Sequence, residues 1–222
     1  MSADGSPDFR RLAPLKVSEL RRRLPRLVLG LCFLGGGIAL TLRARLGVSP
    51  WDVLHQGIAA RLGISFGLVV IGLGLFVLLL WIPMRQRLGL GTIVNTLTVG
   101  LITDAVLARI PPQHNASAQW AMLIGGVVSI ALGVGLYIGA GLGPGPRDGL
   151  MTGIAARGVP IWLVRTGLEL GALVVGWALG GDVGIGTLVF AVGIGPLGHW
   201  FLNRFHLGVD GVDPDPAATF AE

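Results

Sequence analysis

The chain has 222 residues, of which 52% are hydrophobic and only 13% are charged. This charged fraction is about half of that in a typical soluble domain, so the apolar surface exceeds what one compact core can bury. Composition therefore favours an integral membrane protein over a soluble enzyme.

The formal net charge is +5, and the positive excess is concentrated before the first apolar run. We interpret residues 1–24 as a basic, partly disordered cytoplasmic tail that sets the membrane orientation, and not as a nucleic-acid-binding patch. The basic residues that precede or begin the run are Arg10, Arg11, Lys16, Arg21, Arg22, Arg23 and Arg26.

Six apolar runs have about the 20 residues that a helix needs to cross a bilayer. Apolar runs recur along most of the chain, so the first is predicted to be a retained span and not a signal peptide. Cys32 lies in the first run and is the only cysteine, which excludes an intrachain disulfide. The predicted spans are 26–45, 66–84, 89–109, 119–141, 161–179 and 184–204.

Two shorter segments, 50–61 and 146–157, are too short and too polar to cross alone. Each begins with a proline, which suits the first turn of a helix. We expect two short helices that enter the membrane and return without crossing. The alternative is that both cross, which gives eight shorter spans.

The chain repeats itself. LGVSPWDVLHQGIAAR (46–61) matches LGPGPRDGLMTGIAAR (142–157) at ten of sixteen positions, and GLGT (89–92) matches GIGT (184–187). We predict an all-α transmembrane bundle of two tandem repeats, residues 25–110 and 119–205, each with a short broken or re-entrant helix. Three spans in each repeat would insert the second copy upside down, as an inverted 3+3 arrangement. Residues 206–222 are predicted to be an acidic, flexible C-terminal tail.

Asp52 and Asp148 occupy equivalent positions near the start of the two short helices. A carboxylate there either caps the helix or binds a substrate or cation, and the two roles can coexist. His55 lies one turn after Asp52, and Asn95 lies on the third span. Arg147 stands beside a glycine-rich loop whose N–H groups would suit an anion. Hypothetical substrate-binding residues are therefore Asp52, His55, Asn95, Arg147 and Asp148.

Arg165 and Glu169 are four residues apart on one predicted helix, so their side chains share a face. We expect either a structural ion pair or a carboxylate that couples transport to an ion. Glycines at 145, 149 and 153, and at 167 and 171, predict close helix packing. Five tryptophans near run boundaries are predicted to anchor at the membrane interface: Trp51, Trp81, Trp120, Trp162 and Trp200.

No nucleophile elbow, zinc-protease motif, Cys/His cluster or nucleotide-binding loop is present. The sequence therefore predicts no enzyme activity, no catalytic residue, no metal site and no cofactor.

The two short-helix motifs, LGVSPWDVLHQGIAAR and LGPGPRDGLMTGIAAR, together with the paired GxGT elements, resemble the YczE-like bacterial integral membrane proteins, which are related to the YyaS and YitT-like proteins. The resemblance covers about residues 25–205 and implies a multi-pass membrane protein without assigning a substrate. Asp52, Arg147 and Asp148 match its motif positions.

We expect a small-molecule or ion transporter, or a substrate-binding component, in the bacterial plasma membrane with a cytoplasmic N-terminus. The alternative is a non-transporting accessory or scaffold protein. Expected partners are the lipid bilayer and a small-molecule or ion substrate, with a homo-oligomer or another membrane protein also open, and no nucleic acid is expected.

Overall fold

A computed structural model describes residues 17–86 and 88–205, which form eight helices and no strand. Six of the helices are long and apolar enough to cross a membrane, which confirms the six predicted spans. The chain is therefore a multi-pass membrane protein. The helices are α1 (Val17–Ala44), α2 (Pro50–Leu62), α3 (Phe66–Met84), α4 (Leu90–Leu107), α5 (Ala116–Gly139), α6 (Pro146–Ala155), α7 (Ile161–Ala178) and α8 (Ile185–Phe205).

Local signals in the sequence fix the bounds of the short helix α2. Ser49 is its N-cap and accepts a hydrogen bond from the Asp52 N–H, and Pro50 supplies the first helical residue. Gly63 ends the helix in the left-handed conformation, with φ of 67°. α1 begins at Val17, so residues 17–24 of the predicted tail form its first turns. Residues 1–16 and the predicted C-terminal tail lie outside the described residues.

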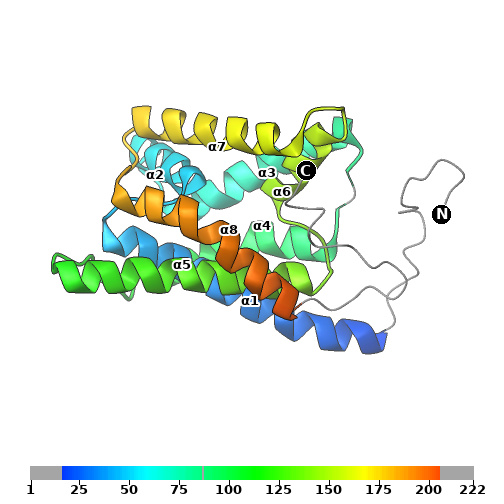
Figure 1. Ribbon diagram of the computed structural model, residues 1–222, viewed down its shortest axis with the longest axis horizontal. Coiled ribbons are helices and arrows are strands. Elements are labelled where there is room, and N and C mark those ends of the chain that lie inside the picture. The colour runs from blue at the N-terminus through cyan, green and yellow to red at the C-terminus, as the bar shows by residue number, and fades with distance from the viewer. Residues whose placement is uncertain (1–16, 87, 206–222) are drawn as a thin grey trace, which may run out of the picture.

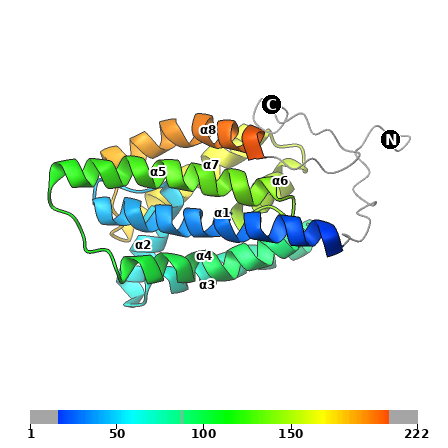
Figure 2. The same ribbon diagram turned by 90° about the horizontal axis from the view of Figure 1, so that it is seen from below.

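The six long helices run side by side in alternating directions (Figures 1 and 2). α1 packs antiparallel to α5, since Gly30 approaches Gly133 while Gly37 approaches Gly126. α4 runs in the direction of α1, and α3, α5 and α8 run the opposite way. α7 again follows the direction of α1 (Figure 1). α2 connects α1 to α3 along the chain, and α6 connects α5 to α7.

The main core lies between α1 and α5, where the four glycines allow the two backbones to approach closely. Large side chains above and below them are fully buried, including Leu27, Leu31, Leu123 and Ile130. Thr103 of α4 ties this pair to its neighbour by donating a hydrogen bond to the Gly35 carbonyl of α1 at 3.1 Å.

Arginines close the ends of the bundle by donating to carbonyl groups at the C-terminal ends of other helices. The last carbonyls of a helix have no partner within it, so a guanidinium from a neighbour stabilises them. Five pairs follow this arrangement: Arg23 with Ala140, Arg26 with Phe205, Arg43 with Leu107, Arg61 with Leu179 and Arg157 with Pro83.

Two details differ from the sequence predictions. Trp51 and Trp81 are buried and are not interfacial anchors, because they pack around the short helices, whereas Trp120, Trp162 and Trp200 are exposed. A methyl group added to Gly167 or Gly171 would have no neighbour within 4 Å in the described chain, so these glycines make no close packing here. Asp104 has a definite structural contact, because it accepts a hydrogen bond from the Gly67 N–H in the first turn of α3 at 2.8 Å.

Candidate functional site

The N-terminal turns of α2 and α6 meet in the interior of the bundle and line the same cavity of about 200 Å³. Its apolar wall comes from the long helices, and its polar wall is contributed mainly by the first turns of the two short helices. All five hypothetical substrate-binding residues lie on this cavity: Asp52, His55, Asn95, Arg147 and Asp148.

Each short helix is held in place by a reciprocal contact with the other half of the chain. The Gly91 N–H at the start of α4 donates to the Leu142 carbonyl, in the loop before α6, at 2.8 Å. The Gly186 N–H at the start of α8 donates to the Leu46 carbonyl, in the loop before α2, at 2.6 Å. Thr92 adds a bond from its hydroxyl to the Pro144 carbonyl at 2.7 Å. The GxGT elements therefore position the loops that aim both short helices at the cavity.

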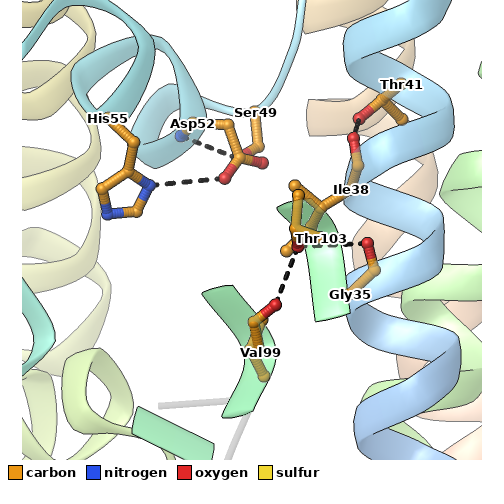
Figure 3. Close-up of polar contacts among 8 residues, drawn as sticks. All are labelled: Gly35, Ile38, Thr41, Ser49, Asp52, His55, Val99 and Thr103. Carbon is orange, nitrogen blue, oxygen red and sulfur yellow. Dashed lines mark hydrogen bonds and ion pairs between the residues drawn. The ribbon is translucent and has the colours of Figure 1, made fainter. Parts of the chain in front are cut away.

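Asp52 is buried and belongs to a small polar cluster on α2 (Figure 3). Its Oδ2 accepts a hydrogen bond from the Ser49 hydroxyl at 2.6 Å, and its backbone N–H donates to the same hydroxyl at 3.2 Å. Its Oδ1 lies 3.5 Å from His55 Nδ1, and the His55 ring meets Phe66 edge-on. Asp52 therefore does not cap its helix itself. One of its oxygens accepts from Ser49, which is the cap, and the other has only the longer contact with His55 among the described residues.

Asp148 is anchored differently, by a residue from another helix. The hydroxyl of Tyr137, a buried residue of α5, donates to Asp148 Oδ2 at 2.9 Å. A methyl group on Gly145 would collide with both the Tyr137 hydroxyl and Asp148 Oδ2. Glycine at the position equivalent to Ser49 therefore makes room for the tyrosine.

Arg147, which precedes Asp148, makes no hydrogen bond or ion pair within the described part of the chain, although its charge interacts electrostatically with Asp148 and Asp52. α6 has no side-chain cap, since its N-cap is Gly145. The backbone N–H groups of Arg147 and Asp148 likewise find no acceptor among residues 17–86 and 88–205. A cationic side chain and an uncapped helix start thus face the cavity together.

Asn95 of α4 is only 9% exposed, and its side-chain amide has no hydrogen-bond partner among the described residues. The interhelical hydrogen bond that is common for asparagine in membranes is absent from this part of the structure. Its neighbour Thr96 is satisfied locally, because its hydroxyl donates to the Thr92 carbonyl at 2.7 Å. Asn95 therefore presents both an amide donor and a carbonyl acceptor to the cavity.

Arg165 and Glu169 form an ion pair along α7, with 3.2 Å between Arg165 Nε and Glu169 Oε1. Arg165 also lines the main cavity, and both side chains line a second space of about 50 Å³ beside Phe190 and Ile194 of α8. α7 and α8 make almost no direct contact with each other, unlike α3 and α4, which pack closely.

Sequence reasoning missed two residues that organise the site, Ser49 and Tyr137. Ser49 had a usable signal, because a serine directly before Pro50, with Asp52 three residues on, is typical of a helix start. Tyr137 had none, since it is close to Asp148 only through the turn between α5 and α6. His199 of α8 also lines the cavity, where it hydrogen-bonds with Asn203 at 3.0 Å. No group of three or more metal-ligating side chains occurs in the described residues.

An all-helical membrane bundle around a polar cavity defines the class of protein. More specifically, residues 21–203 match the model of a family described as "Family of unknown function (DUF6198)", and the chain belongs to this family. An uncharacterized protein of Haemophilus influenzae is 41% identical over 80% of this chain and 82% of its own. The uncharacterized membrane protein YczE of Bacillus subtilis is 35% identical over 73% of this chain and 77% of its own.

The uncharacterized protein YyaS of Bacillus subtilis is also similar, at 28% identity over 78% of this chain and 89% of its own. These relatives confirm the YczE-like family that the two short-helix motifs predicted. No solved structure is significantly similar to the chain.

Proposed function

We propose that this chain is a transporter or solute-binding protein of the bacterial plasma membrane, that its site is the cavity between α2 and α6, and that it catalyses no reaction. The observation that carries this proposal is a set of polar groups without protein partners on an internal cavity. Neither the Asn95 nor the Arg147 side chain has a hydrogen-bond partner among the described residues, and the buried Trp51 Nε1 and His55 Nδ1 on the same cavity also lack one.

Unpaired polar groups are expensive inside a membrane protein. Burying an amide without a hydrogen bond costs about 1–3 kcal/mol by protein mutational data, and charged residues within spans usually mark a pathway or a binding site. Structural roles explain most of the polar contacts of Asp52 and Asp148, which accept hydrogen bonds from Ser49 and Tyr137. Structural roles do not explain why the side chains of Arg147 and Asn95 lack partners. A bound solute would supply a partner for each.

We further propose that the two halves form inverted repeats around the cavity. The opposed directions of α1 and α5, and the matching bonds from Gly91 to Leu142 and from Gly186 to Leu46, support this arrangement. In transporters built from inverted repeats, broken helices meet near the midplane and the two halves rock about the site. The first turns of α2 and α6 have the corresponding placement.

For orientation, we propose a cytoplasmic N-terminus. The basic residues before and at the start of α1 support it, because positive charge favours the cytoplasmic side. The charges of Arg147 and Arg165 do not indicate the orientation, because both residues line the cavity and neither belongs to a loop at the membrane surface.

Ligand-induced thermal stabilisation tests the proposal without knowledge of the substrate. The purified protein in mild detergent is screened against a broad panel of small metabolites and ions, because a ligand that binds only the folded state raises the melting temperature. We expect at least one solute to stabilise the wild type and to lose its effect in Asp52→Asn/Asp148→Asn. The matched control is Asp182→Asn, at an exposed loop aspartate that pairs with Gln56 outside the cavity.

A ligand whose effect survives in the double variant would place its site elsewhere and contradict the proposal. A complete blank would also contradict it, and if a specific membrane protein copurified, the accessory or scaffold function would replace it.

A further inference from the structure

We infer that the cavity takes a small zwitterion, a solute that carries one carboxylate and one ammonium group on a compact apolar body. This inference rests on the proposed function and names the class of solute. Three features of the cavity carry it: a site for an anion at α6, a site for a cation at α2, and a limited volume with apolar walls between long helices.

The anion site is the start of α6. Arg147 has no ion-pair partner within 4 Å in the described residues, and the adjacent helix start has no side-chain cap. A guanidinium beside free backbone N–H groups matches the two oxygens of a carboxylate. Asn95, which is only 9% exposed and lacks a partner in the same residues, adds an amide that reaches into the same cavity.

The cation site is the start of α2. This helix is already capped by Ser49, so it does not need an anion. Asp52 Oδ2 is occupied by the Ser49 hydroxyl, while Oδ1 has only the His55 ring at 3.5 Å among the described residues and is available to an ammonium group. The two short helices therefore differ in what they offer a ligand, although their sequences are similar: α2 offers a carboxylate alone, and α6 a guanidinium beside a carboxylate that already accepts from Tyr137.

The charges on the cavity wall have both signs. With Arg165 paired to Glu169, the remaining charged groups on the cavity are two carboxylates, Asp52 and Asp148, and one guanidinium, Arg147. A zwitterion gives partners to both signs, whereas a simple cation leaves Arg147 without a partner and a simple anion adds to the negative charge in a medium of low dielectric constant.

The volume of the cavity limits the size of the apolar body of the solute. An apolar cavity of about 150 Å³ holds benzene, so in proportion a cavity of about 200 Å³ fits a solute of about eight non-hydrogen atoms. The side chains around it, such as Ile38, Val99 and Ile130, are aliphatic and suit an aliphatic body. An aliphatic amino acid has these dimensions and charges.

The test uses the free L-amino acids together with two matched compounds for each: the amide, which keeps only the ammonium group, and the deaminated acid, which keeps only the carboxylate. For leucine these are leucinamide and 4-methylpentanoate. We expect at least one small amino acid to stabilise the wild-type protein, with the amide and the acid at least tenfold weaker. This comparison needs no variant and so does not depend on a variant that folds.

Variants of the protein then show which residue binds each charged end of the zwitterion. Arg147→Gln should weaken the zwitterion at least tenfold and leave the amide unchanged, and Asp52→Asn should weaken the zwitterion and leave the acid unchanged. Arg147→Lys, which keeps the charge, should retain part of the binding, and Asp182→Asn should retain all of it.

Two results would overturn the inference: no zwitterion binds, or the amide or acid binds as tightly as its parent. The outcome for the proposed function is separate. If a sugar, simple ion or nucleoside binds and depends on Asp52 and Asp148, the proposed function stands and the zwitterion is excluded. If no solute of any class binds, both fail.

Discussion

The short helices α2 and α6 have similar sequences and similar positions at the cavity, yet they complete their first turns with different chemistry. In α2, the hydroxyl that binds the aspartate comes from the N-cap, Ser49. In α6, the N-cap is Gly145 and the hydroxyl comes from Tyr137 of α5. Two short helices of similar sequence can thus keep the same carboxylate contact while one helix start is left free for another use.

The packing behind the two short helices also differs. Gly176 of α7 lies against the backbone of Val53 and Leu54 of α2, whereas Gly149 of α6 lies against the ring of Trp81 of α3. Val53 and Gly149 are equivalent in the repeat at an offset of 96, and Trp81 and Gly176 at an offset of 95. The glycine is thus on the long helix in one case and on the short helix in the other. The close contact is with backbone at α2 and with a large ring at α6.

The largest effect is expected from breaking the contact of α6. Gly149→Val should destabilise the protein by about 3 kcal/mol or prevent its assembly, because overpacking a filled contact costs about 1–3 kcal/mol and the Trp81 ring, which also donates to the Pro146 carbonyl, has little room to move. Thermal unfolding in detergent measures the change. Gly167→Val is the matched control, since no atom of the described chain lies within 4 Å of a methyl group there; equal stability of the two variants would contradict the packing described.

Removal of the tyrosine hydroxyl should have the next largest effect. Tyr137→Phe should cost about 2 kcal/mol, because hydrogen bonds to charged groups contribute about 1.5–3 kcal/mol. A double-mutant cycle with Asp148→Asn measures the coupling between the two side chains directly, and we expect about 1 kcal/mol or more. Additive effects would show that the Tyr137 to Asp148 bond contributes nothing.

A smaller effect is expected at the corresponding bond in α2. Ser49→Ala should cost about 1 kcal/mol, the usual loss when an N-cap serine is replaced. Unfolding of this variant is compared with that of Ser117→Ala, an exposed serine whose hydroxyl has no hydrogen bond to the described residues. If Ser49→Ala matched its control, Ser49 would not be the residue that holds Asp52.

The smallest effect is expected at the ends of the bundle. Arg61→Gln and Arg157→Gln each remove one exposed bond to a helix end, to Leu179 and Pro83. Exposed surface contacts are usually worth about 0.5 kcal/mol or less, so both melting temperatures should stay close to that of the wild type. A large drop for one arginine alone would reveal an asymmetry between the two ends.

The sequence was sufficient for the spans and the short helices, because length, hydropathy and the proline starts are local signals. It also singled out Asp52 and Asp148, since an internal repeat makes two equivalent carboxylates visible. Contacts between distant segments were not accessible in the same way. The partnership of Tyr137 with Asp148, the burial of Trp51 and Trp81, and the open space beside Gly167 depend on how helices from the two halves pack together.

The central claim is that a solute reaches the cavity between α2 and α6, and cysteine accessibility tests it most directly. In a Cys32→Ser background, Asn95→Cys places a thiol on the cavity wall, and Leu188→Cys places one on the 67% exposed outer surface of a membrane span. Thiols react as thiolates, which form in water and not in lipid. The account predicts that a charged methanethiosulfonate reagent modifies Asn95→Cys in membranes and that Leu188→Cys stays unmodified. An unreactive Asn95→Cys in a folded protein would mean a sealed cavity and would contradict the account.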